Sequence, residues 1–324
     1  MRLGNPVIVI TGASSGIGRA TALRCAAKGA RLVLAARGAA ALESAARDCR
    51  KRGATVVAVT ADVSDAAQVE ALAARAVAEF GRLDVWVNNA AVGAFGRIAD
   101  VPPEDFQRIL DVNITGYVNG ARAALARMTA QGGGVLINVA SIVGETPLPY
   151  SAAYSMSKAA VRALSVSLRS ELALDARQDV SVCTVLPATI DTPFYQHAAN
   201  YTGRKPVAMP PVYTADRVAK TVLRAMRHPR REVVAGGAAA RLLMLQHKAT
   251  PGAVERAIAR QVDRTQLRRR PTATTSGNIH SSLDAARKGS VDGGWRGRRR
   301  TARRRILTAA VLAGAAAVVR KRMA

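Results

Sequence analysis

The chain has 324 residues, a formal net charge of +26 at neutral pH and a hydrophobic content of 49%. This length and apolar content predict a globular protein of one or two domains. Three cysteines without CxxC spacing (Cys25, Cys49 and Cys183) exclude a neat disulfide framework, and the N-terminus lacks the features of a signal peptide. We therefore expect a reduced, cytoplasmic protein, with export unlikely.

The N-terminal region has the pattern of a dinucleotide-binding unit. Residues 7–10 form an apolar run typical of a buried parallel strand, and TGASSGIG follows at residues 11–18. A glycine-rich turn alone is weak evidence. Here, however, a helix at residues 17–28 and a second strand at residues 31–36 complete a βαβ unit, whose main-chain amides can approach a pyrophosphate. The turn residues expected to contact the cofactor are Gly12, Ser14, Ser15, Gly16, Ile17 and Gly18.

The end of the second expected strand bears on the choice of cofactor. It reads Ala36-Arg37, without the carboxylate that usually holds the ribose of NAD. Nothing there repels a 2′-phosphate, and the Arg37 guanidinium can pair with one. NADP is therefore preferred over NAD. The alternative is that Arg37 is one more surface arginine in an arginine-rich chain.

Polar residues follow the next two strands. The expected elements are a helix at residues 40–52, a strand at 55–60, a helix at 66–80 and a strand at 83–87. Asp62 and Val63 follow the third strand, where we expect contact with adenine. Asn88 and Asn89 follow the fourth strand, before Ala90. These two asparagines are either turn formers or groups that bond the backbone of neighbouring loops.

The remaining pattern predicts one doubly wound α/β sheet. Residues 104–128 read as one long or two abutting helices, in which Asn113 suggests a local break or a polar role at the cleft. Strands at 135–139, 180–186 and 232–234 and helices up to 174 and at 214–227 complete the series. Six or seven strands that alternate with helices are typical of a parallel sheet covered on both faces.

A serine, a tyrosine and a lysine are expected to meet at one cleft. Ser141 follows the strand at residues 135–139, at the sheet edge where open α/β proteins bind ligands. Tyr154 and Lys158 are four residues apart, and therefore share one face of a helix. A held cation favours a phenolate, so this pair suits acid–base chemistry.

The ordered motifs resemble those of the classical short-chain dehydrogenases/reductases, over about residues 5–236. The matching positions are TGASSGIG (11–18), Asp62, NNAA (88–91), Asn113, Ser141, YSMSK (154–158) and PATIDT (187–192). The resemblance implies a Rossmann-like single domain and a catalytic tetrad of Asn113, Ser141, Tyr154 and Lys158. The sequence departs from the family pattern at two places, NNAA for NNAG and Pro187-Ala188 for PG, and each change adds a Cβ. We expect these changes to alter how the substrate or cofactor fits, not to abolish activity.

The resemblance also implies roles for these residues. Tyr154 would exchange a proton with the substrate oxygen, which Ser141 would bind. Lys158 would bind the nicotinamide ribose and lower the pKa of Tyr154, and Asn113 would hold a water that links the lysine to solvent. The implied activity is hydride transfer between NADP(H) and a carbonyl or secondary alcohol, in a homo-oligomer and without a metal. Further implied cofactor contacts are Asn89, Ala90, Tyr154, Pro187, Ile190 and Thr192.

The substrate is expected to be apolar. Residues 193–213 lie where the family places its substrate lid, and they include Phe194 and other aromatic side chains. Val143 and Pro149 are expected to line the same pocket, together with Ser141 and Tyr154. The alternative function is a non-catalytic nucleotide-binding scaffold or sensor that acts through a basic tail at a membrane or nucleic acid.

The tail differs in composition from the body. Residues 264–324 hold 16 of the 48 Lys and Arg but only 2 of the 22 acidic residues. We expect a catalytic domain at residues 1–236, a helical cap or interface at 237–263, a basic disordered linker at 264–305, and a short apolar helix with basic flanks at 306–324.

The function of the tail stays open between three interpretations. The apolar run at residues 306–319 would be a helix of about 21 Å, short of the ~30 Å hydrocarbon core, so spanning is marginal. Association with an anionic membrane face is easier, because each basic residue adds about 1 kcal/mol. A solvated or self-associating tail is the second interpretation. Nucleic-acid contact is the weakest, because few aromatic residues accompany Trp295.

Overall fold

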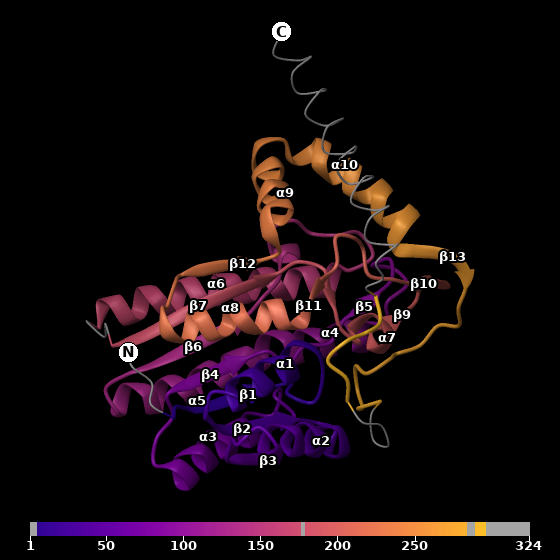
Figure 1. Ribbon diagram of the computed structural model, residues 1–324. Coiled ribbons are helices and arrows are strands. Elements are labelled where there is room, and N and C mark those ends of the chain that lie inside the picture. Colours follow the sequence, from indigo (N-terminus) through magenta and orange to yellow (C-terminus); the bar gives the residue numbers. More distant parts are fainter. Residues whose placement is uncertain (1–4, 176–178, 284–288, 296–324) are drawn as a thin grey trace.

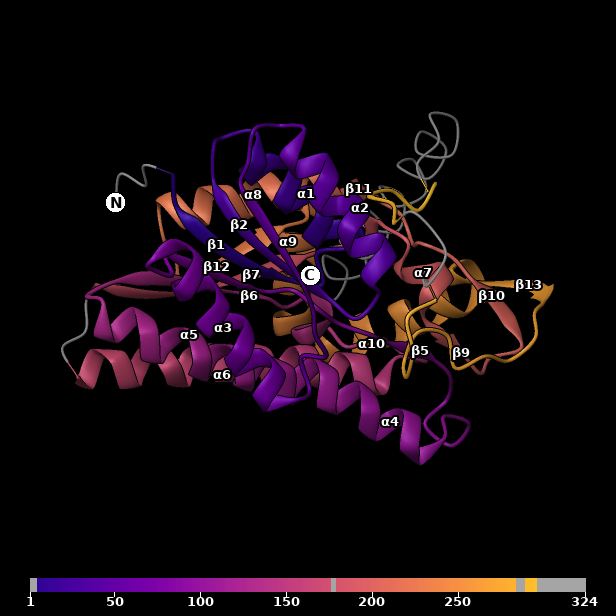
Figure 2. The same cartoon turned by 90° about the horizontal axis from the view of Figure 1, so that it is seen from below.

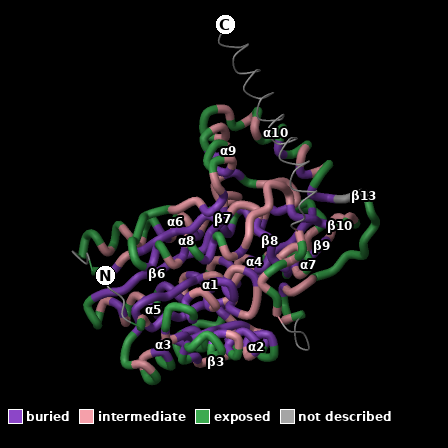
Figure 3. Tube along the Cα trace, in the orientation of Figure 1, coloured by how far each residue is buried: buried purple, intermediate pink, exposed green. Residues whose placement is uncertain are grey.

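The structure is a computed structural model that describes residues 5–175, 179–283 and 289–295. Within these residues, seven parallel strands form one sheet in the order β12-β7-β6-β4-β1-β2-β3, which confirms the predicted fold class. The strands are β1 (Val7–Thr11), β2 (Arg31–Ala36), β3 (Val56–Thr60), β4 (Val85–Asn88), β6 (Gly134–Val139), β7 (Val180–Pro187) and β12 (Glu232–Ala235). Most of their apolar side chains are buried because helices cover both faces of the sheet (Figure 3).

Three long helices lie on each face of the sheet (Figures 1 and 2). One face carries α1 (Gly16–Ala26), α2 (Ala39–Arg50) and α8 (Ala215–Arg227). The other face carries α3 (Ala66–Phe80), α5 (Gly116–Ala130) and α6 (Ala152–Leu174). The two cores consist largely of Ala, Val, Leu and Ile, so small aliphatic side chains fill the space between the layers.

The region around Asn113 breaks as the sequence predicts. Helix α4 (Pro103–Leu110) passes into a π-helical turn at Asp111–Thr115, and α5 follows directly. The Asn113 side chain bonds both the main-chain N–H and C=O of Val92, on the connection after β4. This cross-link gives the interruption a local structural reason.

The segment at residues 237–263, expected to be a helical cap or interface, is not one continuous helix. It divides into α9 (Gly237–Ala249) and α10 (Pro251–Gln261) around Thr250, which has non-helical dihedral angles. The physical reason is Pro251, which has no N–H to donate and disfavours a helical conformation in the residue before it. The two helices rise above one end of the sheet, as Figure 1 shows.

Short elements form the loop at residues 193–213 and its two ends. Strand β8 (Ile190–Asp191) comes just before the loop, and α7 (Phe194–His197), β9 (Ala199–Asn200), β10 (Arg204–Pro206) and β11 (Tyr213–Thr214) follow. Strand β9 pairs with β5 (Ala94–Phe95), and β11 pairs with β8. These pairings hold the loop over the carboxyl ends of the main strands.

The predicted disordered linker is wrong where the structure describes it. After a π-helical turn at Val262–Gln266, β13 (Leu267–Pro271) pairs antiparallel with β10. Further along, Ile279 is fully buried in the core. Composition missed this because main-chain pairing and single buried side chains hold the segment, not a large apolar core of its own.

The remaining tail predictions fall on other residues. Residues 296–305 of the expected linker and the expected apolar helix at 306–324 lie outside the described residues. In the part that the structure describes, no helix is both long and apolar enough to cross a membrane.

Candidate active site

A cavity of about 1120 Å³ lies at the carboxyl ends of the central strands. Its walls come from the glycine turn, the strand ends, α6, the loop at 193–213, and the two helices α9 and α10. It brings together most of the site residues predicted from the sequence: Gly12, Ser14, Ser15, Gly16, Ile17, Arg37, Asp62, Val63, Asn89, Ala90, Ser141, Val143, Tyr154, Lys158, Pro187, Ile190, Thr192 and Phe194.

Three predicted residues are not among those that line the cavity. Gly18 packs on the turn, where a Cβ would come within 2.2 Å of the Gly12 carbonyl oxygen. Asn113 is completely buried behind the wall. The prediction for Pro149 is wrong, since Leu148 and Ser151 line the cavity instead. The chain turns at residues 149–150, so the side chains on either side of the turn face inward.

Lys158 is buried without a carboxylate partner among the described residues. Its Nζ donates to the Tyr117 hydroxyl at 3.1 Å and to the Val139 carbonyl oxygen at 3.0 Å. The Tyr117 hydroxyl in turn donates to the same carbonyl at 2.8 Å. Burial lowers the pKa of Lys158 to about 7. The amine can therefore be charged or neutral near neutral pH.

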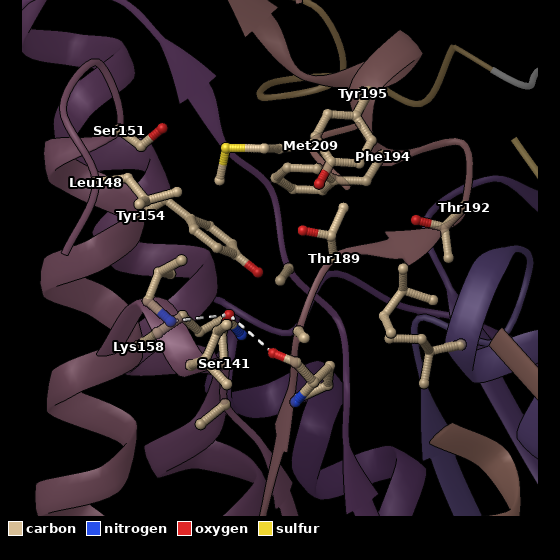
Figure 4. Close-up of a pocket in the computed structure, with 18 of the residues that line it drawn as sticks. Ser141, Leu148, Ser151, Tyr154, Lys158, Thr189, Thr192, Phe194, Tyr195 and Met209 are labelled. Carbon is tan, nitrogen blue, oxygen red and sulfur yellow. Dashed lines mark hydrogen bonds between the residues drawn. The ribbon is translucent and has the colours of Figure 1, made fainter. Parts of the chain in front are cut away.

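Tyr154 lies above Lys158 on the same face of α6, and its hydroxyl points into the cavity (Figure 4). The Lys158 Nζ is 5.5 Å from the centre of the Tyr154 ring. Burial raises the pKa of Tyr154, and a hydrogen bond with Ser141 acts in the opposite direction. The raised pKa differs from the lowered pKa that the sequence predicts for Tyr154. The Lys158 amine donates to Tyr117 and Val139 rather than to Tyr154.

Ser141 stands at the carboxyl end of β6 and begins a short 3₁₀ turn, Ile142–Gly144. Its Oγ accepts from the Val143 amide at 3.3 Å and donates to the Pro187 carbonyl oxygen at 3.4 Å. Figure 4 shows the hydroxyl beside Lys158, below the Tyr154 ring. Both bonds to Ser141 are long, so the hydroxyl can exchange them for a bond to a ligand oxygen.

Asn113 connects the π-helical turn with α6. Its Oδ1 accepts from the Val92 amide at 2.9 Å, and its Nδ2 donates to Val92 O at 2.8 Å and to Ser157 Oγ at 3.0 Å. The Ser157 hydroxyl donates to the main-chain oxygen of Tyr154 at 2.8 Å. Asn113 therefore helps to fix the turn of α6 that carries Tyr154 and Lys158.

The glycine turn packs closely on the loop after β4. Gly12 has a φ of +64°, and a Cβ there would lie 2.8 Å from Ala90 Cα. Asn89 Nδ2 donates to the Thr11 carbonyl oxygen at 2.9 Å, and Asn88 Nδ2 donates to Asn138 Oδ1 at 3.0 Å. Both asparagines thus bond neighbouring segments, which decides between the two interpretations of this pair.

Arg37 is not an isolated surface arginine. Its guanidinium donates to the main-chain oxygens of Asn278, Ile279 and His280. Burial lowers the pKa of Arg37. Asp62, close by, accepts hydrogen bonds from Ser64 and Arg108; burial opposes ionisation, yet these bonds hold its pKa below the usual value.

Sequence reasoning missed several contributors to the site. Tyr117 lies four residues after Asn113, and this helical spacing could have indicated a second phenol near the cleft. The cavity residues on α9 and α10, such as Leu243 and Ile258, were assigned only to a cap or an interface. No sequence signal pointed to Asn278, which comes to the cavity through the fold of the C-terminal segment.

Comparison with known proteins identifies the family. A family model described as short chain dehydrogenase matches residues 6–215. The chain therefore belongs to the short-chain dehydrogenase family, and the protein is an oxidoreductase of that family.

Several relatives are similar over much of the chain. The uncharacterized oxidoreductase YxnA of Bacillus subtilis is 40% identical over 75% of this chain and 69% of its own length. The probable oxidoreductase EphD of Mycobacterium tuberculosis is 44% identical over 58% of this chain, but this match spans only 32% of EphD.

Solved structures show the same fold. A short-chain dehydrogenase/reductase from Burkholderia phymatum in complex with NAD has a TM-score of 0.66 and 28% identity, and the match covers 85% of this chain and 99% of that one. An alcohol dehydrogenase from Thermococcus sibiricus, complexed with 5-hydroxy-NADP, has a TM-score of 0.62 and 30% identity, with coverage of 71% and 95%.

Proposed function

We propose that the protein transfers a hydride between NADP(H) and the carbonyl or secondary alcohol group of an apolar substrate. The observation that carries this proposal is that Ser141, Tyr154 and Lys158 line one cavity with the glycine turn. The similarity to proteins solved with NAD and with an NADP derivative supports a nicotinamide cofactor. The non-catalytic alternative is not favoured, because the serine, tyrosine and lysine are all present at the cavity.

The residues at the glycine turn fit a dinucleotide. Gly12 and Gly16 have φ values of +64° and +51°, which only glycine adopts readily. At the start of α1, the Gly16 amide donates to Ser290 O, whereas the next residue, Ile17, lines the cavity. The Ile17 amide is therefore the one that suits a diphosphate. The nicotinamide supplies the hydride when it is bound.

Tyr154 and Ser141 handle the substrate oxygen. Since burial raises the pKa of Tyr154, the phenol holds its proton at neutral pH and can donate it to a carbonyl oxygen during reduction. The Ser141 hydroxyl, at the same end of the sheet, holds that oxygen by a hydrogen bond. Lys158, with a pKa of about 7, can then return a proton toward the phenol.

Apolar side chains above Tyr154 favour an apolar substrate. Phe194, Tyr195 and Met209 stand opposite the Tyr154 hydroxyl in Figure 4. The Phe194 and Tyr154 rings are 5.2 Å apart between centroids. Leu243 and Ile258 extend the apolar wall toward α9 and α10. A ketone with a bulky aliphatic or aromatic body would bury its surface here.

A substrate panel tests the proposal. Purified protein, with NADPH and NADH in turn, is assayed with steroids, fatty and aromatic ketones, quinones and sugars. We expect NADPH oxidation with at least one apolar ketone and little with sugars. Lack of turnover with every compound and both cofactors, in either direction, would contradict the proposal.

We also propose a cytoplasmic homo-oligomer whose basic tail associates with an anionic membrane face. The family resemblance supports the oligomer, and the basic residues that flank residues 306–319 support the association. Deletion of residues 296–324 should release the protein from sedimented anionic vesicles. If the protein sediments with the vesicles equally with and without these residues, the result contradicts the proposed membrane association.

A further inference from the structure

The last described residues of the chain lie against the proposed dinucleotide site. Residues 276–283 and 289–295, here called the C-terminal segment, follow β13 and are coloured yellow in Figure 1. The family match ends at residue 215, so it assigns this segment no role. The segment nevertheless contacts Gly16, Arg37 and Thr192, which are expected to bind the cofactor.

The first half of the segment bonds the Arg37 guanidinium. The main-chain oxygens of Asn278, Ile279 and His280 accept its hydrogen bonds. This half is firmly anchored, because the Ile279 side chain is fully buried and His280 Nε2 lies 2.6 Å from Asp105 Oδ1. The guanidinium that would pair with a 2′-phosphate is therefore already bonded to neutral carbonyls.

The second half of the segment bonds the start of α1. Ser290 O accepts from the Gly16 amide at 2.8 Å, and Gly289 O accepts from Arg19 Nη1 at 2.6 Å. Gly289 packs so closely on the glycine turn that a Cβ there would lie 2.1 Å from Ser14 O. A helix N-terminus attracts anions, but here the Gly16 amide bonds a main-chain carbonyl oxygen instead.

The far end of the second half is fixed on the residues of and after β8. Asp191 Oδ1 accepts from the amides of Gly293 and Trp295 at 3.0 and 2.9 Å. Trp295 Nε1 donates to Thr192 O at 3.0 Å, and its ring packs on Tyr195 with 5.5 Å between the centroids. The second half therefore runs from the start of α1 to the neighbourhood of β8.

The segment and a dinucleotide would use the same donors. Residues 289–295 do not line the cavity, so they leave its volume open and instead bond groups at its edge. Phosphate oxygens are stronger partners than neutral carbonyls for a guanidinium or for an amide at a helix N-terminus. A phosphate that reaches Gly16 or Arg37 therefore has to replace a carbonyl of the segment.

We propose that the C-terminal segment is an autoinhibitory element that competes with the dinucleotide. While residues 289–295 are in place, they withhold the Gly16 amide from the cofactor and lower its affinity. Binding at full affinity requires their release from the glycine turn. The inference rests on the proposed function, since it requires a nicotinamide dinucleotide at this turn, and it adds control of cofactor loading by the chain itself.

Two glycine variants of the full chain test the competition. In Gly289→Ala the new methyl group would lie 2.1 Å from Ser14 O, and in Gly293→Ala it would lie 2.2 Å from a main-chain oxygen of the body. Each variant should therefore lift the second half. We expect the Kd of NADPH in fluorescence titration to fall about fivefold or more, because the competing bonds are lost. Gly252→Ala is the matched control with an unchanged Kd, since a Cβ there would meet nothing nearer than 3.5 Å.

Asp191→Asn tests the same contact without a steric clash. Asp191 is not among the residues that line the cavity, and the change replaces a charged acceptor of two segment amides by a neutral one of the same size. We expect the Kd of NADPH to fall about twofold or more. In stopped-flow mixing, NADPH should associate faster with this variant than with the unaltered protein.

The outcomes separate autoinhibition from the proposed function. If NADPH binds the unaltered protein, and its Kd is unchanged or higher in Asp191→Asn and in each folded glycine variant, autoinhibition is overturned while the proposed function stands. Binding by the variants but not by the unaltered protein supports both. If neither the unaltered protein nor any variant binds NADPH or NADH, the proposed function fails, and autoinhibition fails with it.

Discussion

Lys158 is the residue whose environment departs most from that of an exposed side chain. It is almost completely buried, and its described partners are a neutral hydroxyl and a carbonyl oxygen. The nearest titratable groups, Tyr117 and Tyr154, stay neutral near pH 7 because burial raises the pKa of both. The depressed pKa of Lys158 therefore links stability to pH.

The sign of this linkage gives a prediction for Lys158→Met. The unfolded chain keeps the lysine proton up to a pKa of 10.5, whereas the folded chain releases it at about 7. Between these values the unfolded state binds more protons, so this group adds up to about 1.4 kcal/mol to the free energy of unfolding per pH unit. Relative to Lys158→Met, the unaltered protein should gain about 2 to 3 kcal/mol from pH 7 to pH 9 in urea unfolding.

The exposed Lys28 provides a control for that measurement. Lys28→Met should show the same pH dependence as the unaltered protein, because its side chain is open to solvent. Parallel stability curves for the unaltered protein and Lys158→Met would contradict the linkage.

Arg37 gives a second prediction at the scale of one residue. Its three main-chain partners are uncharged, so none of them neutralises its positive charge. A 2′-phosphate can pair with the guanidinium by replacing one of these carbonyls. We expect the unaltered protein to bind NADPH more tightly than NADH, and Arg37→Ala to reduce this ratio about tenfold or more. Calorimetric titration of both cofactors measures the ratio. An unchanged ratio in Arg37→Ala, or a preference for NADH in the unaltered protein, contradicts the proposed cofactor.

At the scale of elements, sequence periodicity predicts the sheet and most helices well. Residues 66–80 form α3 within the expected bounds, because the apolar spacing is regular and Gly81 ends the helix with a φ of +76°. The proposed catalytic residues Ser141, Tyr154 and Lys158 were also accessible to sequence reasoning, because Ser141 follows a strand and the other two lie at helical spacing. The position of the C-terminal residues Asn278 and Ser290 was not, because it depends on long-range main-chain bonds to His197 and Gly16.

The packing of α5 on β4 depends on the lack of a side chain at Gly120. A Cβ there would come within 2.1 Å of Asn88 Oδ1, which accepts from Trp86 Nε1 at 2.7 Å. Asn88 also bonds Asn138, whose Nδ2 donates to Ser165 on α6 at 2.9 Å. This buried polar network ties two strands to both neighbouring helices.

Gly120→Ala should therefore destabilise the protein. Overpacking and a broken buried hydrogen bond together cost about 2 to 4 kcal/mol, which denaturant unfolding would measure. Gly252→Ala is the matched control near the start of α10, where the new methyl group has space and should be neutral or stabilise by up to about 1 kcal/mol. Equal stability of the two variants would show that α5 can move away from β4 at little cost.

At the scale of the whole molecule, the cavity lies where the distant parts of the chain meet. Its walls combine the turn after β1, α6, the loop at 193–213, α9 and α10, and the C-terminal residues Asn278, Ser282 and Leu283. Strand ends of the sheet form the base of the cavity, and residues of α9 and α10 line it as well. A ligand in this cavity would contact most of these parts at once.

Cofactor binding should therefore stabilise the folded protein. At an NADPH concentration of about 100 times Kd, linkage adds about 2.7 kcal/mol to the free energy of unfolding. Thermal unfolding would record this as a rise in Tm. Nicotinamide mononucleotide, which lacks the adenosine half, should raise Tm less at the same concentration. No rise with either NADPH or NADH would contradict a dinucleotide site in the cavity.

Turnover of Tyr154→Phe tests the proposed chemistry most directly. With NADPH and the best ketone of the panel, we predict that kcat falls by about a hundredfold or more while the Kd of NADPH changes little. The variant loses the proton donor but keeps the other cofactor contacts. Tyr150→Phe, which alters a tyrosine outside the cavity that bonds Asp263, should keep its turnover. Turnover by Tyr154→Phe equal to that of the unaltered protein would contradict the account.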